Sequence, residues 1–164
     1  MADREYLLPD ERGSVVILDS TLTHMYRHIQ KGALDKEAGG QLFSPNPHEV
    51  RVIVSTATGP YPQDRRTRSY FEPNRRIAIQ DRKLQFEKGN NAIGIWHTHP
   101  QAIPSPSGQD ISTTLNYLSS SQAALDGFIL AILGNKGEPI SLSLWLALST
   151  QRNISWVKLL ELPD

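Results

Sequence analysis

The stretch GIWHTHPQAIPSPSGQD, residues 94–110, constrains the fold of this chain more than any other segment. The apolar run Ala92–Trp96 leads directly into His97, which predicts that His97 and His99 lie at the end of a buried strand. Alternate side chains of a strand point to the same face. We therefore expect the two imidazoles to share one face of the strand and Trp96 to fill core on the other.

Two imidazoles on one face can bind a single metal ion, and the segment that follows can supply a third ligand. A helix is expected from Ser107 to about Ser121, with Ser107 or Asp110 in its first turn. If the loop stiffened by Pro104 and Pro106 brings that turn to the strand end, Asp110 supplies a carboxylate. Two histidines and one carboxylate leave a position open on zinc, as in catalytic zinc sites, so hydrolysis is the expected reaction class. Surface histidines with ordinary hydrogen bonds are the alternative.

The remaining patterns predict a mixed α and β domain with several antiparallel hairpins. Strands are expected over Ser14–Leu18, Glu37–Phe43, Glu49–Thr58, Ser69–Pro73, Gly127–Leu133, Ile140–Leu148 and Ser155–Leu162, and helices from Asp19 or Ser20 to about Lys31 and from Asn74 to about Glu87. The turn-forming SPNPH is expected to join the second and third of these strands in a hairpin, and residues 59–68 are expected to form a loop.

The amino-acid composition excludes several classes of function. The 164 residues predict one domain, 1–164, that is long enough to bury a core without structural metals. The chain has no cysteine, which excludes thiol nucleophiles and thiolate zinc sites. Its 17 basic and 17 acidic side chains cancel, so we expect no nucleic-acid partner and no anionic membrane partner. The charged N-terminus and the lack of a long apolar run predict a soluble, cytoplasmic protein.

The longer pattern His-x-His-x7-Ser-x2-Asp, with a glutamate upstream in KEAGGQLF, resembles the signature of the JAMM (JAB/MPN) metalloprotease family. The resemblance extends from SVVIL to the final strands. It implies the fold of that family: an α/β (α+β mixed), MPN/JAMM, cytidine-deaminase-like fold with a mostly antiparallel curved sheet flanked by helices. It also implies a Zn²⁺ cofactor bound by His97, His99 and Asp110, with Glu37 as general base and then general acid. Ser107 is expected to stabilise the oxyanion, and loss of such a donor typically costs about 10²–10³ in rate.

JAMM enzymes hydrolyse the amide or isopeptide bond after the C-terminal glycine of ubiquitin or a ubiquitin-like protein. The combination of EAGGQLF, ATGP, DRRTRSYF, GIWHTHP and PSPSGQD resembles the stand-alone bacterial JAB peptidases of anti-phage cyclic-oligonucleotide (CBASS) operons. That resemblance implies deconjugation of a cyclic-oligonucleotide synthase from its targets and a functional link to an E1–E2-like enzyme. The alternatives are processing of another ubiquitin-like or sulfur-carrier tail, and a non-catalytic MPN interaction module. In either enzymatic case the conjugated C-terminal tail is the expected partner.

Three further features have structural explanations beside the functional ones. His24 and His28 have zinc-compatible helix spacing, but Met25 stands where a metalloprotease motif needs glutamate, so partly exposed helix histidines are expected. The basic stretch 64–83 has the composition of a phosphate-backbone site, but no nucleic-acid-binding motif surrounds it and the chain is neutral. A groove for an acidic tail, a partner surface or a solvated face is therefore favoured. Gly39 and Gly40 either let the backbone approach substrate or zinc, or mark a bulge.

Overall fold

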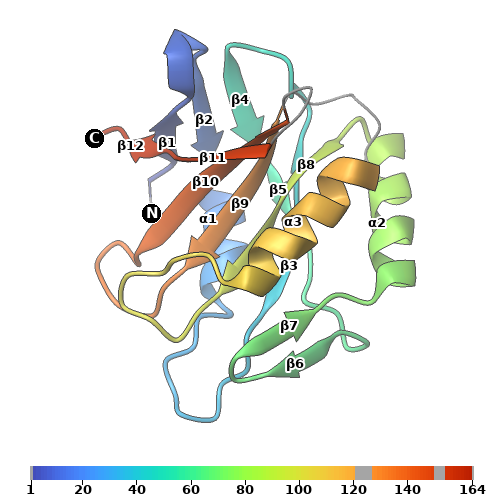
Figure 1. The fold of residues 1–164 in the computed structure, drawn as a ribbon, viewed down its shortest axis with the longest axis vertical. Coiled ribbons are helices and arrows are strands. Elements are labelled where there is room, and N and C mark those ends of the chain that lie inside the picture. Colours follow the sequence, from blue (N-terminus) through green and yellow to red (C-terminus); the bar gives the residue numbers. More distant parts are fainter. Residues whose placement is uncertain (1, 121–126, 150–153, 164) are drawn as a thin grey trace.

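The computed structural model describes residues 2–120, 127–149 and 154–163 (Figure 1). Its elements in chain order are β1 (Arg4–Leu7), the short 3-10 turn η1 (Pro9–Glu11), β2 (Ser14–Ile17), α1 (Asp19–Tyr26), β3 (Gly39–Ser44), β4 (Arg51–Val54), β5 (Thr56–Ala57), β6 (Arg65–Thr67), β7 (Tyr70–Glu72), α2 (Arg75–Glu87), β8 (Asn91–Thr98), α3 (Gly108–Ser120), β9 (Gly127–Leu133), β10 (Leu142–Ser149), β11 (Ile154–Lys158) and β12 (Leu160–Glu161). Among the described residues, none of the helices is both long and apolar enough to cross a bilayer.

A six-stranded sheet with the strand order β11-β10-β9-β8-β3-β5 lies at the centre of the fold. Its neighbouring strands are antiparallel except β8 and β9, which are parallel. Parallel neighbours need a long crossover connection, and α3 lies between these two strands in the chain. A four-stranded sheet (β12-β1-β2-β4) and the β6–β7 hairpin complete the β structure. The mixed α/β class and the mostly antiparallel sheet are therefore confirmed.

The six-stranded sheet separates two hydrophobic cores. On one face Trp96 packs in a cluster with Met25 of α1 and with the inner side chains of the four-stranded sheet. On the other face Ile95 clusters with Phe128, and Leu118 of α3 covers them. Figure 1 shows the same layering, with α3 in front of β8, α1 behind the sheet and α2 at the right-hand edge of the view. Because the strand alternates, His97 faces the layer that contains α3.

The expected hairpin between Glu37–Phe43 and Glu49–Thr58 is wrong in part. The second segment divides at Ser55: β4 pairs in parallel with β2, and only β5 returns to pair antiparallel with β3. β2 is buried along its whole length, so both of its edges need a neighbouring strand. β1 covers one edge, and the largely apolar β4 covers the other. The first segment also starts late, because β3 begins at Gly39 and leaves Glu37 in the preceding loop.

Several other helices and strands also begin or end at residues other than those expected from the sequence. α1 ends at Tyr26 rather than near Lys31, since the amides after it bond three residues back and the side chain of Gln30 turns into the core. The expected strand Ser155–Leu162 is divided between β11 and β12, which lie in different sheets. The loop expected over 59–68 contains β6, and β1 was not expected.

The helices around the candidate site agree with the sequence. α2 is capped by Asn74, whose side chain accepts a hydrogen bond from the Ile77 amide at 3.2 Å. α3 covers 108–120, close to the expected range, and Ser121 lies outside the described residues. Residues at the start of α2 and in α3 line a small cavity together with His97, so both helices lie on the His97 side of the central sheet.

Candidate active site

β8 carries the two histidines to the end of a central, buried strand. His97 lies opposite Gly39 of β3 and Ile132 of β9, and the amide of His99 continues the ladder by donating to the Leu133 carbonyl at 2.8 Å. Both imidazoles are buried, with 2% and 6% of the residues exposed. The expected opposite orientation of Trp96 is confirmed, because it is fully buried in the other core.

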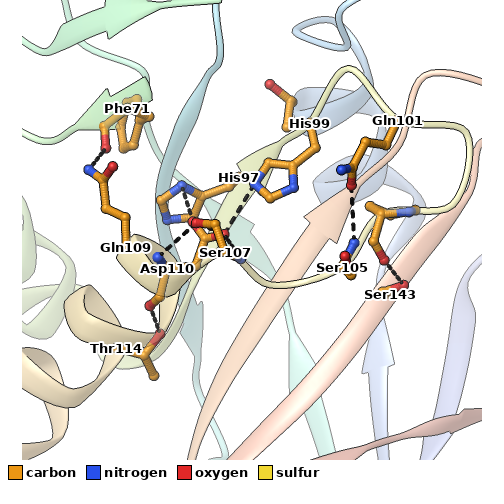
Figure 2. Close-up of polar contacts among 12 residues, drawn as sticks. Phe71, His97, His99, Gln101, Ser105, Ser107, Gln109, Asp110, Thr114 and Ser143 are labelled. Atoms are coloured by element: carbon orange, nitrogen blue, oxygen red, sulfur yellow. Dashed lines mark hydrogen bonds and ion pairs between the residues drawn. The ribbon is translucent and has the colours of Figure 1, made fainter. Parts of the chain in front are cut away.

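Asp110 reaches the histidines from the first turn of α3. The backbone N–H and the hydroxyl of Ser107 both donate to its Oδ2 at 2.7 Å, and the Asp110 amide donates back to Ser107 Oγ at 3.2 Å. This is a reciprocal capping arrangement in which an aspartate replaces the usual glutamate. It fixes the carboxylate at the helix N-terminus, where the helix dipole favours a negative charge. Figure 2 shows the carboxylate pointing at both imidazole rings.

The carboxylate and the two rings are in direct contact. Asp110 Oδ1 lies 3.4 Å from His97 Nδ1, and Asp110 Oδ2 lies 3.1 Å from His99 Nε2. Burial would raise the pKa of Asp110, but the hydrogen bond from His99, the His97 ring and the two Ser107 donors outweigh it and lower the pKa to about 2. Burial lowers the pKa of His97 to about 4, so this imidazole is neutral at pH 7. A neutral imidazole beside an ionised carboxylate is a ligand pair ready for a metal cation.

Two imidazoles and a carboxylate have the donor chemistry of a zinc site, and the two donor pairs that involve Asp110 have a compatible separation. Two donors about 2.0–2.1 Å from a tetrahedral zinc ion are separated by ~3.3 Å, close to the two N···O distances above. In the described part of the chain, however, no group of three or more His, Cys, Asp or Glu side chains is placed so that it could hold a metal ion. Asp110 instead contacts both rings directly. Metal binding would replace those contacts.

Glu37 lies in the loop just before β3 and is also buried, with 8% of the residue exposed. Burial raises its pKa to about 7, His99 opposes the rise and Asp110 adds to it, which places the Glu37 carboxyl in the electrostatic field of the candidate ligands. Its backbone is held at both ends of the residue. The Glu37 amide donates to the Thr67 carbonyl at 2.7 Å, and Arg66 Nε donates to the Glu37 carbonyl at 2.6 Å. A carboxyl with a pKa near neutrality is suited to accept and return a proton.

Sequence reasoning missed the residues that hold the Glu37 loop in place. Thr98, between the two histidines, accepts a hydrogen bond from the Ala38 amide at 2.9 Å and contacts Gln30 Oε1 at 3.4 Å. Gln30 is almost fully buried and donates to the carbonyls of Asp35 and Arg68 at 3.1 and 2.7 Å. The polar residue inside an otherwise apolar strand was a signal for Thr98. Nothing in the local sequence marks Gln30.

Phe71 of β7 closes the site on one side. Its ring meets the His97 ring edge-on at 5.2 Å, and its carbonyl accepts a hydrogen bond from Gln109 of α3 at 3.0 Å (Figure 2). Gly39 makes room for this ring, because a Cβ there would lie 2.7 Å from the Phe71 ring and from the Trp96 carbonyl. The irregularity of β3 lies between Leu42 and Phe43 instead. Close packing against Phe71, rather than a bulge, therefore explains Gly39.

The proline-rich loop between the ligands is fixed to the β9–β10 connection. Ser143 donates to the Pro104 carbonyl at 2.8 Å, and the Asn135 amide donates to the Gln101 carbonyl at 2.9 Å. Figure 2 shows Ser143 of β10 next to this loop, which itself carries Gln101 and Ser105. The loop is thus held from a neighbouring part of the sheet, as well as stiffened by its prolines.

The other candidates from the sequence lie elsewhere. His24 and His28 are partly exposed, as expected, although His28 lies just after the end of α1. Both rings pack against Trp96, with ring centres 5.9 and 5.8 Å away. His24 Nε2 is also 2.6 Å from the Gly59 carbonyl oxygen. The basic stretch 64–83 does not form one patch. Arg66 and Arg68 bond to loop carbonyls, whereas Arg82 lies over a ring of α3.

Comparisons with known proteins agree with this arrangement. The family described as prokaryotic homologues of the JAB domain matches residues 18–147, a stretch that contains all five candidate residues. A protein of Pseudomonas aeruginosa named CD-NTase/cGAS isopeptidase is 36% identical over 106 residues, which cover 63% of this chain and 66% of that protein, just under two thirds of its length. An Escherichia coli protein with the same name is 24% identical over 156 residues and 92% of each chain.

Solved structures show the same fold. The solution structure of a Desulfitobacterium hafniense protein covers 86% of this chain and 88% of its own at a TM-score of 0.59 and 17% identity. A Salinibacter ruber protein, also solved in solution, covers 87% and 86% at a TM-score of 0.50 and 18% identity. These structures support the fold alone. The match of the family to most of the chain decides the assignment: this chain belongs to the prokaryotic homologues of the JAB domain.

Proposed function

We propose that this protein is a zinc-dependent isopeptidase that releases a conjugated protein by hydrolysing the bond after its C-terminus. The observation that carries the proposal is the convergence of two buried histidines and a buried aspartate beside the buried glutamate Glu37. Burial of four ionisable side chains in one place is costly to a fold. Such clusters are characteristic of functional sites.

Each of these residues has a proposed role. His97, His99 and Asp110 would hold Zn²⁺, which supplies Lewis acidity and makes water nucleophilic near neutral pH when it is bound. Glu37 would accept a proton from the attacking water and deliver it to the leaving amine. The hydrogen bonds on both sides of Glu37 fix its backbone, which restricts the positions that its carboxyl can take.

The proposed role of Ser107 in stabilising the oxyanion depends on the orientation of its hydroxyl. Its hydroxyl donates to Asp110 in this structure, so stabilising an oxyanion requires the hydroxyl to turn away from that carboxylate. If Asp110 were engaged as a metal ligand, the Ser107 hydroxyl would no longer be needed as its donor. The hydroxyl would then be available to a developing negative charge nearby.

The names of the two relatives indicate the substrate class. Both are called CD-NTase/cGAS isopeptidases, which is consistent with deconjugation of a cyclic-oligonucleotide synthase in bacterial antiviral defence. We extend this to the present chain as part of the proposal, together with the functional link to an E1–E2-like enzyme. An extended C-terminal tail can bind beside a sheet edge through main-chain hydrogen bonds.

The test is cleavage of a fusion in which the C-terminal tail of a bacterial cyclic-oligonucleotide synthase is joined to a reporter protein. Intact mass identifies the broken bond. Native protein and Glu37→Gln should carry equal zinc, and only the native protein should cut at the junction. The matched control is Glu49→Gln, which changes an exposed carboxylate far from the histidines in the chain and should cut as the native protein does. Failure of fully zinc-loaded native protein to cut would contradict the proposed substrate, and failure on other ubiquitin-like tails as well would leave an interaction module.

A further inference from the structure

A groove lies between α2 and α3, next to the candidate active site. Its volume is about 470 Å³, and it is lined by Arg75, Ala78 and Arg82 of α2 and by Thr113, Asn116 and Tyr117 of α3. The α2 residues are spaced i, i+3 and i+7 and the α3 residues i, i+3 and i+4, so each set forms one stripe of its helix. Figure 1 shows α3 in front of the central sheet and α2 to its right.

The charged side chains that line the groove, Arg75 and Arg82, are both positive. Neither Arg75 nor Arg82 forms an ion pair with a carboxylate in the described part of the chain, and none of the described lining residues is acidic. Three carboxylates lie nearby without lining the groove. Glu72 shares a neighbouring pocket with Arg75 and pairs with Arg65, and the charges of Asp81 and Asp64 act on Tyr117. Asp81 accepts hydrogen bonds from Gln41 and Thr58, and Asp64 accepts them from two backbone amides. Two guanidinium groups therefore remain to attract an anionic partner.

Arg82 is held in position for such a contact. Its guanidinium carbon lies 5.1 Å from the centre of the Tyr117 ring, a cation–π arrangement. Stacking uses the face of the guanidinium and leaves the N–H groups at its edge, where they can bind a carboxylate with two parallel hydrogen bonds. Because the ring restricts the side chain, less conformational entropy is lost when a ligand binds.

The same contacts favour an acidic peptide over a nucleic acid. Single-stranded nucleic acids bind by stacking bases on exposed aromatic faces. Tyr117 offers none, because Arg82 covers one face and Phe128 stacks on the ring with a centroid separation of 5.5 Å. The chain also has no net positive charge to attract a long polyanion.

The groove is connected to the candidate site through α3. Thr113 is one helical turn after Asp110, and it lines both the groove and a small cavity that contains His97. We propose that this groove is a docking site for an acidic segment of the protein substrate, near the bond that is cut. The substrate role rests on the proposed isopeptidase function, whereas the binding of acidic peptide does not.

Binding is measured with a fluorescently labelled peptide of alternating aspartate and glutamate, by anisotropy with the native protein and with Arg75→Gln, Arg82→Gln and the double variant. The control is Arg76→Gln, since Arg76 is an exposed arginine of the same helix that does not line the groove. We expect the double variant to bind about tenfold more weakly or worse, and Arg76→Gln to bind as the native protein does. Affinity should also fall as salt is added.

Two results would overturn the proposal: equal binding by all variants, or a single-stranded DNA probe that binds more tightly than the peptide and depends on the same arginines. Arg75→Gln keeps the test decisive if Arg82→Gln unfolds, because Arg75 is exposed and does not pack on Tyr117. On a cleavable conjugate with an acidic segment, Arg75→Gln should raise KM and leave kcat unchanged. If native protein cleaves nothing, the isopeptidase proposal fails while the peptide measurement still decides the groove.

Discussion

Ser107 and Asp110 form a reciprocal pair at the start of α3, in which Ser107 donates twice to the carboxylate and the Asp110 amide donates to the serine hydroxyl. The same carboxylate contacts His97 and His99. The helix cap and the candidate ligand set therefore share one side chain. A change at the cap is expected to affect both the stability of the helix and the geometry of the site.

Ser107→Ala removes the hydroxyl and two of the three hydrogen bonds of this pair. We expect the free energy of unfolding to fall by about 1 kcal/mol, the usual cost of losing a serine cap. Urea denaturation of the metal-free protein measures this, with Ser112→Ala, an exposed serine of the same helix, as the control. A Ser107→Ala protein as stable as native would contradict the capping role.

Gln30→Leu tests whether the buried network positions Glu37. The substitution leaves the carbonyls of Asp35 and Arg68 without their buried donor, at ~1–3 kcal/mol for each unsatisfied group. Gln30 contacts neither histidine in the structure, so we expect kcat to fall about tenfold or more while zinc affinity stays unchanged. Gln80→Leu, at an exposed position, should change neither quantity. Equal losses of zinc affinity and rate would show that the network shapes the metal site instead.

Gly39→Ala introduces a Cβ into space filled by Phe71 and the backbone of Trp96. The neighbours must move, so we expect ~1–3 kcal/mol of destabilisation, the range for overpacking a core. Gly108→Ala is the matched change, because a Cβ there meets nothing within 4 Å, and it should be neutral or slightly stabilising. Thermal unfolding of the two variants separates these outcomes, and similar melting temperatures would refute the packing explanation.

His28 gives the stability a pH dependence. Burial, and then the neighbouring His24, Arg66 and Arg27, lower the pKa of His28 below its ordinary value of 6.5. Below that value the unfolded chain binds more protons than the folded one, so stability is lost as the pH falls. Above it both states are neutral at this residue. We expect His28→Gln to lose less stability than native between pH about 7.5 and about 5.5 in urea denaturation. Identical losses would contradict this prediction.

The sequence predicted best what local patterns determine. The run from Ala92 to Trp96 determined β8, Asn74 determined where α2 begins, and the spacing of His97, His99 and Asp110 indicated side chains that the structure brings together. The metal and the catalytic roles remain predictions.

Long-range pairing was not predictable. The division of 49–58 between two sheets depends on the free edge of β2, a partner distant in sequence. The contacts of Gln30 join three segments that the sequence alone does not bring together. The α2–α3 groove likewise depends on the relative placement of two helices, although the arginines of 64–83 had indicated a basic surface. Residues that support a site through distant partners carry no local pattern.

The most direct test of the central claim is the zinc stoichiometry of the purified protein, measured by native mass spectrometry for the native chain, His99→Ala and Asp110→Asn. His48→Ala, at an exposed histidine, serves as the control. We expect one zinc ion per chain in the native protein and in His48→Ala, and severe loss in the two ligand variants. Zinc bound equally by all four proteins, or by none, would contradict a metal centre formed by His97, His99 and Asp110.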